Sequence, residues 1–263
     1  YWVFPLEGLS EAGRGVLATI TWVATWWILE VLPLGITSLL PIILLPIFTN
    51  VTGKEAATSY ADPLNFLFLG GFAIALALER WRLHERIAIT VISLVGTSLS
   101  GLIIGFMLAT GFLSMWVSNT ATALLMIPIG TAIAGKVIEL MREEEGHSEL
   151  EEIKVQKSII FAIGFGATIG GSATLIGTPT NLILGGLSKE LLGIDISFAR
   201  WMLFAVPLIT LLMICASFYL TRIAYPLKVK RLSGSAAFIE QTRKDLGPMS
   251  YEEKMVSLIF ILT

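Results

Sequence analysis

Long apolar runs separated by short charged loops divide the chain, and this pattern constrains the fold more than any other feature. Hydrophobic residues make up 55% of the 263 residues, charged residues only 14%, and the mean hydropathy is +0.80. A soluble domain has about a quarter of its residues charged. No run alternates apolar and polar positions as a membrane β-strand does, so the spans are predicted to be helices. The sequence therefore predicts an all-α membrane protein with several spans.

Seven apolar segments are predicted, several of them near the minimum length for a span. They are Gly15–Leu29, Pro33–Phe48, Leu64–Leu78, Ile87–Gly111, Ala121–Gly135, Ser158–Gly186 and Trp201–Ile223. If Glu79–Arg86 is cytoplasmic and the fourth and fifth segments return the chain to the same side, only Arg14, Lys54, Lys189 and Arg200 of the 18 basic residues lie outside. This asymmetry predicts the orientation of a multi-pass protein of the cell (inner or plasma) membrane.

The stretch "SMWVSNT" (114–120) places four uncharged polar side chains between the fourth and fifth segments. Two full spans and a re-entrant hairpin would satisfy the charge asymmetry equally. Polar groups facing lipid cost several kcal/mol each, whereas a turn buried in protein beside a water-filled cavity is tolerated. We therefore expect a re-entrant helical hairpin with this stretch at its tip and a half-helix beginning near Ser118 or Asn119. The preceding "LERWRLHER" suits a short helix in the cytoplasmic interface.

A second polar break is predicted in the glycine-rich run "FAIGFGATIGGSATLIGTPTNLILGG" (161–186). Pro179 lacks a backbone donor and disfavours helical geometry at the preceding residue. We expect a helix to about Leu175, an unwound "GTPT" loop, and a second helix starting near Pro179 with Thr178 as its N-cap. Close helix packing is the expected role of four further glycines. These are Gly164, Gly166, Gly170 and Gly171.

Two helix N-termini with hydroxyl and amide side chains favour an anion, above all a carboxylate, and unwound carbonyls favour a hard cation such as sodium. No Asp, Glu, Lys, Arg or His occurs in residues 87–135 or 158–188. These segments therefore offer no proton relay, and co-bound cations are expected to neutralise the anion. The alternative is that "SNT" consists only of small residues that pack between helices.

Two motifs, "FLSMWVSNTATALLMIPIG" (112–130) and "GGSATLIGTPTNLILGG" (170–186), resemble the first Ser-Asn-Thr hairpin and the following broken helix of the divalent anion/sodium symporter family. The early "EVLPLGITSLLPIILLPIF" (30–48) also resembles this family. The resemblance implies sodium-coupled uptake of succinate, malate or fumarate, with citrate, sulfate or an exchange mode as alternatives. It also implies two inverted repeats, a homodimer and an elevator-like motion.

By this resemblance, sodium binds at Ser114, Ser118, Asn119 and the carbonyl of Gly177. The substrate-binding residues are Ser118, Asn119, Thr120, Thr178 and Pro179. The chain has one "SNT" and one broken helix, so we expect it to be one half of an inverted-repeat transporter, with the second repeat elsewhere.

The expected division has six parts: 1–78 as scaffold and dimer spans, 79–138 as interfacial helix and hairpin, 139–157 as a cytoplasmic loop, 158–186 as the broken helix, 187–223 as an extracellular loop and scaffold span, and 224–263 as a basic cytoplasmic connector and the start of the second repeat.

The histidines His84 and His147 stand apart, and the lone Cys215 lies in an apolar run. Neither a zinc site nor an enzyme is therefore expected. The charge of −2 gives no reason to expect a nucleic-acid partner. The remaining alternative class is a channel subunit.

Overall fold

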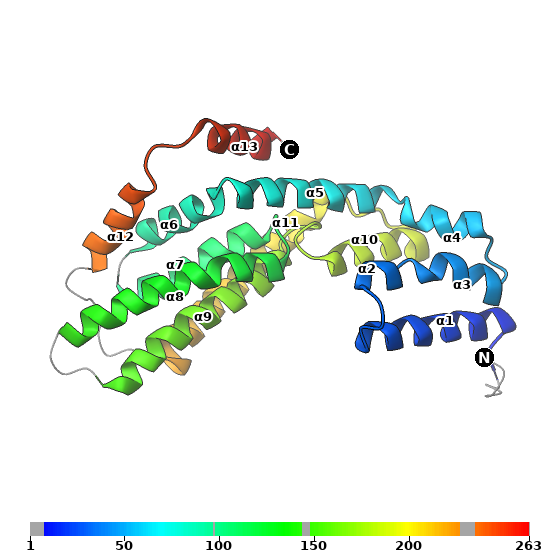
Figure 1. Cartoon of the computed structure of the whole chain (residues 1–263), viewed down its shortest axis with the longest axis horizontal. Coiled ribbons are helices and arrows are strands. Elements are labelled where there is room, and N and C mark those ends of the chain that lie inside the picture. Colours follow the sequence, from blue (N-terminus) through cyan, green and yellow to red (C-terminus); the bar gives the residue numbers. More distant parts are fainter. Residues whose placement is uncertain (1–7, 97, 144–147, 227–234, 263) are drawn as a thin grey trace. The chain divides into compact units, whose positions relative to one another are not determined.

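A computed structural model of the chain describes residues 8–96, 98–143, 148–226 and 235–262, and every regular element in them is helical (Figure 1). The all-α prediction is confirmed. Part of the predicted cytoplasmic loop (144–147, with His147) and part of the basic connector (227–234, with Lys228, Lys230 and Arg231) lie outside the described residues. The chain forms two compact units divided after Phe66.

The first unit contains α1 (Glu11–Ile28), α2 (Leu34–Thr37), α3 (Leu40–Phe48), α4 (Gly53–Tyr60) and the start of α5 (Pro63–Arg80). Within it, α1 packs closely on α3, because a Cβ atom at Gly15 would lie 1.9 Å from the Phe48 carbonyl oxygen. Thr52 and Glu55 form a capping box that starts α4. The predicted apolar segment Pro33–Phe48 contains α2 and α3.

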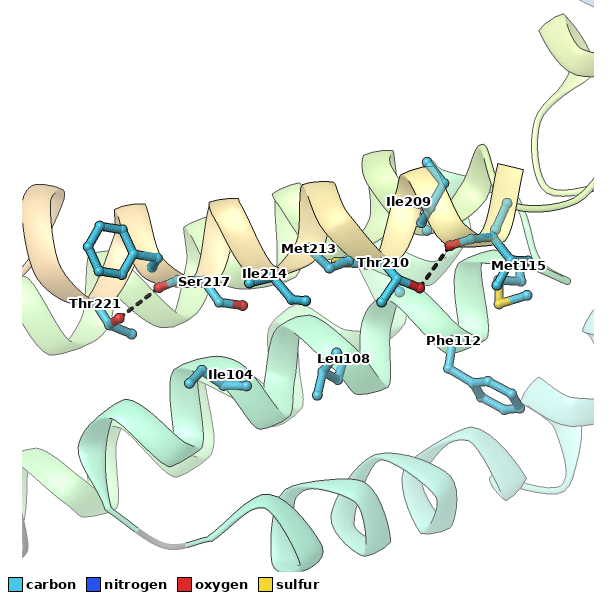
Figure 2. Close-up of a pocket in the computed structure, with 15 residues that line it drawn as sticks. Ile104, Leu108, Phe112, Met115, Ile209, Thr210, Met213, Ile214, Ser217 and Thr221 are labelled. Carbon is cyan, nitrogen blue, oxygen red and sulfur yellow. Dashed lines mark hydrogen bonds between the residues drawn. The ribbon is translucent and has the colours of Figure 1, made fainter. Parts of the chain in front are cut away.

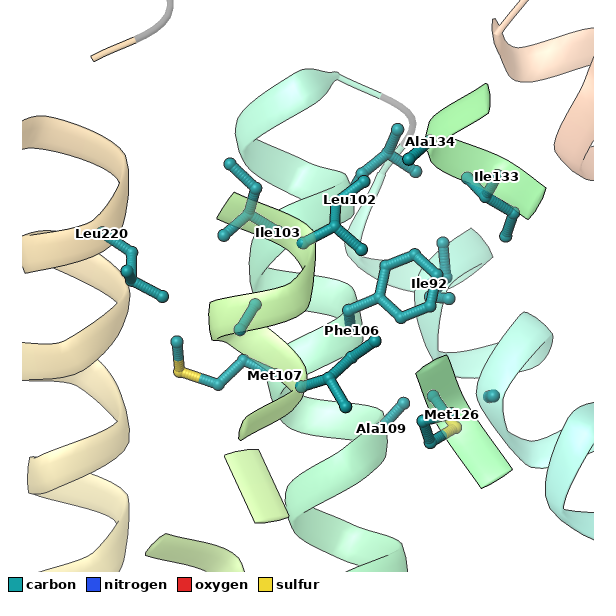
Figure 3. Packing of buried hydrophobic residues seen from close by; sticks show 14 of the residues in the cluster. Ile92, Leu102, Ile103, Phe106, Met107, Ala109, Met126, Ile133, Ala134 and Leu220 are labelled. Carbon is teal, nitrogen blue, oxygen red and sulfur yellow. The ribbon is translucent and has the colours of Figure 1, made fainter. Parts of the chain in front are cut away.

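The second unit holds the rest of α5 and all later helices. They are α6 (Leu83–Val95), α7 (Leu99–Ser114), α8 (Asn119–Glu143), α9 (Glu149–Gly171), α10 (Pro179–Leu192), α11 (Phe198–Phe218) with its π-helical end η1 (Tyr219–Ala224), α12 (Ser235–Asp245) and α13 (Tyr251–Leu262). Helices α7, α8 and α9 run side by side (Figure 1). They enclose an apolar core in which Phe106, Met126 and Ile163 are fully buried. Figure 3 shows Phe106 and Met126 in this core.

Two sequence predictions fail between α5 and α7. The predicted segment Ile87–Gly111 is interrupted at Gly96, whose φ of 121° favours glycine. Ser98 then caps α7 by accepting a hydrogen bond from the Gly101 N–H at 3.0 Å. The stretch "LERWRLHER" is a corner rather than one short helix, because α5 ends at Arg80 and Arg82 adopts a left-handed conformation before α6.

Four helical stretches of the described residues are long and apolar enough to cross a membrane. They are Gly53–Arg80, Asn119–Glu143, Glu149–Gly171 and Phe198–Ala224, and the shorter apolar stretches include Leu34–Phe48 and Leu99–Ser114. Helix α7 has 16 residues and is about 24 Å long at 1.5 Å per residue, less than the 30 Å hydrocarbon layer. Its length suits one arm of a re-entrant hairpin.

Glycines allow α9 to approach α7 and the hairpin tip at three of the four predicted positions. A Cβ atom at Gly166 would lie 2.6 Å from the Met107 carbonyl oxygen, and one at Gly170 would lie 2.2 Å from that of Gly111. A Cβ atom at Gly171 would lie 1.9 Å from Asn119 Oδ1 at the hairpin tip. The prediction is wrong for Gly164, which is exposed: a Cβ atom there would have no described heavy atom within 4 Å.

Candidate functional site

The hairpin tip is held against α9 by the buried hydroxyl of Ser114, the last residue of α7. Ser114 Oγ lies 2.9 Å from Asn119 Oδ1 and 2.8 Å from the carbonyl oxygen of Ala167 on α9. A hydroxyl has one proton and therefore donates to one of these oxygens at a time. Helix α8 begins at Asn119, as predicted, and Ser118 Oγ accepts a hydrogen bond from the Ala121 N–H at 3.4 Å.

The second break begins earlier than predicted, because α9 ends at Gly171 rather than near Leu175. The side chain of Asn181 accounts for part of this difference. Its Nδ2 donates to the carbonyl oxygens of Gly171 at 3.2 Å and Thr174 at 2.7 Å, so backbone groups of the unwound loop are satisfied from α10. Helix α10 starts at Pro179 as predicted.

Thr178 occupies the N-cap position with an extended backbone, but its side chain makes no capping hydrogen bond. The prediction that Thr178 is the N-cap of α10 is therefore confirmed, although the side-chain hydrogen bond common at such a position is missing. The fixed φ of Pro179 and its missing N–H suit the first helical position, so α10 can begin without a side-chain cap.

The two breaks meet around three glycine-dependent contacts. A Cβ atom at Gly171 would lie 1.9 Å from Asn119 Oδ1. A Cβ atom at Gly177 would lie 2.3 Å from the Gly171 carbonyl oxygen and 2.9 Å from that of Ser114. Oxygen atoms from the hairpin tip and from the end of α9 thus gather beside Gly177, where a side chain would exclude them. Such a set of uncharged oxygens suits a hard monovalent cation.

Thr174 joins the two breaks by hydrogen bonds. Its Oγ1 donates to the carbonyl oxygen of Met115 in the hairpin turn and accepts from the Gly177 N–H at 3.0 Å. Sequence reasoning missed the roles of Thr174 and Asn181 and predicted only helix packing for Gly171, although Asn181 belongs to the "GTPTN" motif and its amide was a visible signal.

The predicted site residues divide into two groups. Ser114, Asn119 and Gly177 come together as described. Within the described part of the chain, the side chains of Ser118, Thr120 and Thr178 make no hydrogen bond to that group, and Thr120 and Pro179 are exposed. The second group lies at the starts of α8 and α10, where free backbone N–H groups and the positive helix ends are located.

No group of three or more His, Cys, Asp and Glu side chains that could hold a metal ion occurs among the described residues. His84 is buried in the corner between α5 and α6, with Nδ1 3.2 Å from the Leu78 carbonyl oxygen, and Cys215 is exposed on α11. The chemistry of the site therefore rests on neutral oxygens and backbone dipoles.

A separate cavity of about 530 Å³ lies between α7 and α11 (Figure 2). Its lining is mostly apolar, and the hydroxyls of Thr210 and Thr221 donate to the carbonyl oxygens of Val206 and Ser217 in their own helix. Because these hydroxyl protons are already used, the cavity offers little to a carboxylate. It does not include the oxygen cluster beside Gly177.

Fold and site define a multi-pass helical membrane protein with uncharged polar groups gathered at two helix breaks, an arrangement found in membrane carriers. The family model described as citrate transporter (CitMHS) matches residues 24–262, and the chain belongs to this family.

The curated relatives include the sodium-dependent dicarboxylate transporter SdcS of Staphylococcus aureus strains USA300 and NCTC 8325. Each is 45% identical over 259 residues, which cover 98% of this chain and 49% of the relative. The chain thus spans about half the length of the curated relatives it matches. The predicted resemblance and the multi-pass membrane location are confirmed, and both the family and these relatives are described as transporters rather than enzymes.

Proposed function

We propose that this chain forms one half of a transporter that couples sodium entry to the uptake of C4-dicarboxylates such as succinate, malate and fumarate. The observation that carries the proposal is the meeting of two helix breaks beside Gly177. The names of the relatives support the ion and the substrate class.

Sodium would bind among the oxygens at the two breaks. The candidate ligands are the hydroxyls of Ser114 and Ser118, the amide oxygen of Asn119 and the carbonyl of Gly177. The Gly171 and Ser114 carbonyl oxygens, which lie close to the Gly177 Cβ position, would add to the negative potential there. Sodium is a cargo of this protein rather than a resident metal.

A carboxylate group of the substrate would bind at the starts of α8 and α10. Ser118, Asn119 and Thr120 stand at the first of these ends, and Thr178 and Pro179 at the second. The anion would be neutralised by the helix dipoles and by co-bound sodium, because residues 87–135 and 158–188 contain no Asp, Glu, Lys, Arg or His. This dependence of each bound ion on the other is the physical basis of coupling.

The larger assembly follows from the family resemblance. Residues 1–78 and α11 would belong to the scaffold of a homodimer, and the hairpin and broken helix would move against it in an elevator-like manner. A second, inverted repeat would supply the other half of the substrate site.

The test is uptake of radiolabelled succinate into proteoliposomes that contain the full-length protein, with and without an inward sodium gradient. We expect sodium-dependent, saturable uptake that is lost in Asn119→Ala and retained in Asn50→Ala, a matched change at an exposed asparagine of the first unit. Persistent uptake when choline replaces sodium would refute the coupling. Currents far above carrier rates would support a channel instead, and uptake of citrate or sulfate without succinate would correct the substrate.

A further inference from the structure

Thr174 links the two helix breaks through one buried hydroxyl. The residue is 0% exposed and lies in the unwound loop between α9 and α10. Its Oγ1 uses its proton for the Met115 carbonyl oxygen and a lone pair for the Gly177 N–H. Its own carbonyl oxygen accepts from Asn181 Nδ2 at 2.7 Å. Both the hydroxyl and the backbone carbonyl of Thr174 are therefore hydrogen-bonded.

The hydroxyl bonds the backbone of Met115, which is next to a candidate sodium ligand, and the backbone of Gly177, which is one. Met115 follows Ser114 at the end of α7, and Gly177 is itself a candidate ligand. The Ser114 carbonyl oxygen lies 2.9 Å from the Gly177 Cβ position, so a small shift of either backbone changes the spacing of the oxygens. The Thr174 hydroxyl is the side-chain group that bonds both backbones at once.

We propose that Thr174 is a positioning residue that holds the hairpin tip and the Gly177 loop at the spacing that sodium requires, and so sets the apparent sodium affinity. This inference rests on the proposed sodium-coupled function. Thr174 itself contacts neither ion nor substrate in this proposal.

Valine has nearly the same shape as threonine but can neither donate nor accept a hydrogen bond. In Thr174→Val the Gly177 N–H and the Met115 carbonyl oxygen would each lose their hydrogen bond to the Thr174 hydroxyl. A buried polar group without a hydrogen bond costs free energy, so the loop would move to form other hydrogen bonds. We expect the sodium concentration for half-maximal uptake to rise about tenfold. Thr174→Ser retains the hydroxyl and should restore a value near that of wild type.

Thr110 provides a matched control. It is also 0% exposed and lies on α7, but its hydroxyl has no hydrogen-bond partner among the described residues. Thr110→Val therefore changes the same atoms at an equally buried position without breaking a hydrogen bond. Its sodium dependence should equal that of wild type.

The experiment is a sodium titration of succinate uptake by the full-length protein in proteoliposomes, with turnover at saturating sodium and the unfolding temperature measured in parallel. The proposal predicts a right-shifted sodium curve for Thr174→Val, near-normal turnover at saturating sodium, and rescue by serine. A purely structural role would lower the unfolding temperature without shifting the sodium curve, and that result would overturn the inference. An equal shift in Thr110→Val would overturn it as well. If wild-type uptake does not depend on sodium, the proposed function itself fails.

Discussion

Replacing Gly170 by alanine should force α7 and α9 apart at the point where they cross most closely. A Cβ atom at this position would lie 2.2 Å from the carbonyl oxygen, 2.4 Å from the Cα and 2.6 Å from the carbonyl carbon of Gly111. All three are backbone atoms, so no rotation of a side chain relieves the clash. Restoring ordinary contact requires a separation of about 1 Å.

The cost of this separation falls on both stability and transport. Overpacking of a well-packed core costs about 1 to 3 kcal/mol, and the upper end applies where backbone must move. The next residue, Gly171, lies against Asn119 of the hairpin tip, so the same displacement would disturb the candidate sodium ligands. Gly170→Ala should therefore unfold at a lower temperature and lose sodium-dependent succinate uptake.

Gly164→Ala is the matched control on the same helix. A Cβ atom there would have nothing within 4 Å, and the position is exposed. Alanine is the better helix former by up to about 1 kcal/mol, so this variant should be as stable as wild type or more stable. Thermal unfolding of the detergent-purified proteins and uptake in proteoliposomes measure both effects. Equal unfolding temperatures and equal uptake in the two variants would refute the packing argument.

Three further changes test other contacts. Gly171→Ala should abolish uptake, because its Cβ atom would lie 1.9 Å from Asn119 Oδ1 and displace the Asn119 amide. The protein should still fold, because the displaced group is the end of a flexible side chain; unchanged sodium activation would contradict this prediction. Thr178→Val should raise the KM for succinate several-fold with little change in sodium activation, and an equal loss of both would show that Thr178 shapes the loop instead. Hydrogen bonds from Arg86 lower the pKa of Glu253 from its ordinary value of 4.5, so the pair stabilises the folded protein above that pH and its contribution is lost as the pH falls through the lowered pKa. Unfolding temperatures of wild type should therefore exceed those of Glu253→Gln, by the equivalent of about 1 to 3 kcal/mol at pH 7, and converge with them as the pH falls through the lowered pKa; a constant difference would refute the assignment.

Helix starts were predictable where the signal lies in the local sequence. Pro179 fixes its own φ and cannot donate a hydrogen bond, so the start of α10 follows from one residue. The start of α8 at Asn119 was likewise predictable from the polar "SNT". The break at Gly96 also had a local signal, since Ser98 is a good N-cap, but the surrounding apolar residues concealed it.

The end of α9 was not predictable in the same way, because distant side chains determine it. Residues 172–175 contain nothing that forbids a helix. The helix nevertheless stops at Gly171, where Asn181 and Thr174 supply hydrogen bonds from α10 and to the hairpin turn. A sequence pattern identified the two polar breaks, whereas their meeting beside Gly177 depends on tertiary contacts that no local pattern contains.

The absence of Asp, Glu, Lys, Arg and His from residues 87–135 and 158–188, which include the hairpin tip and the helix break, has an electrical consequence. These segments carry no fixed charge, so their movement through the membrane without bound ions would transfer no side-chain charge. Each unneutralised charge that moves across the membrane contributes about 2.3 kcal/mol per 100 mV. Under the proposed sodium-coupled transport, membrane voltage would act on these residues through any charge difference between bound sodium and the bound anion, and the return of the empty site would move no side-chain charge of theirs.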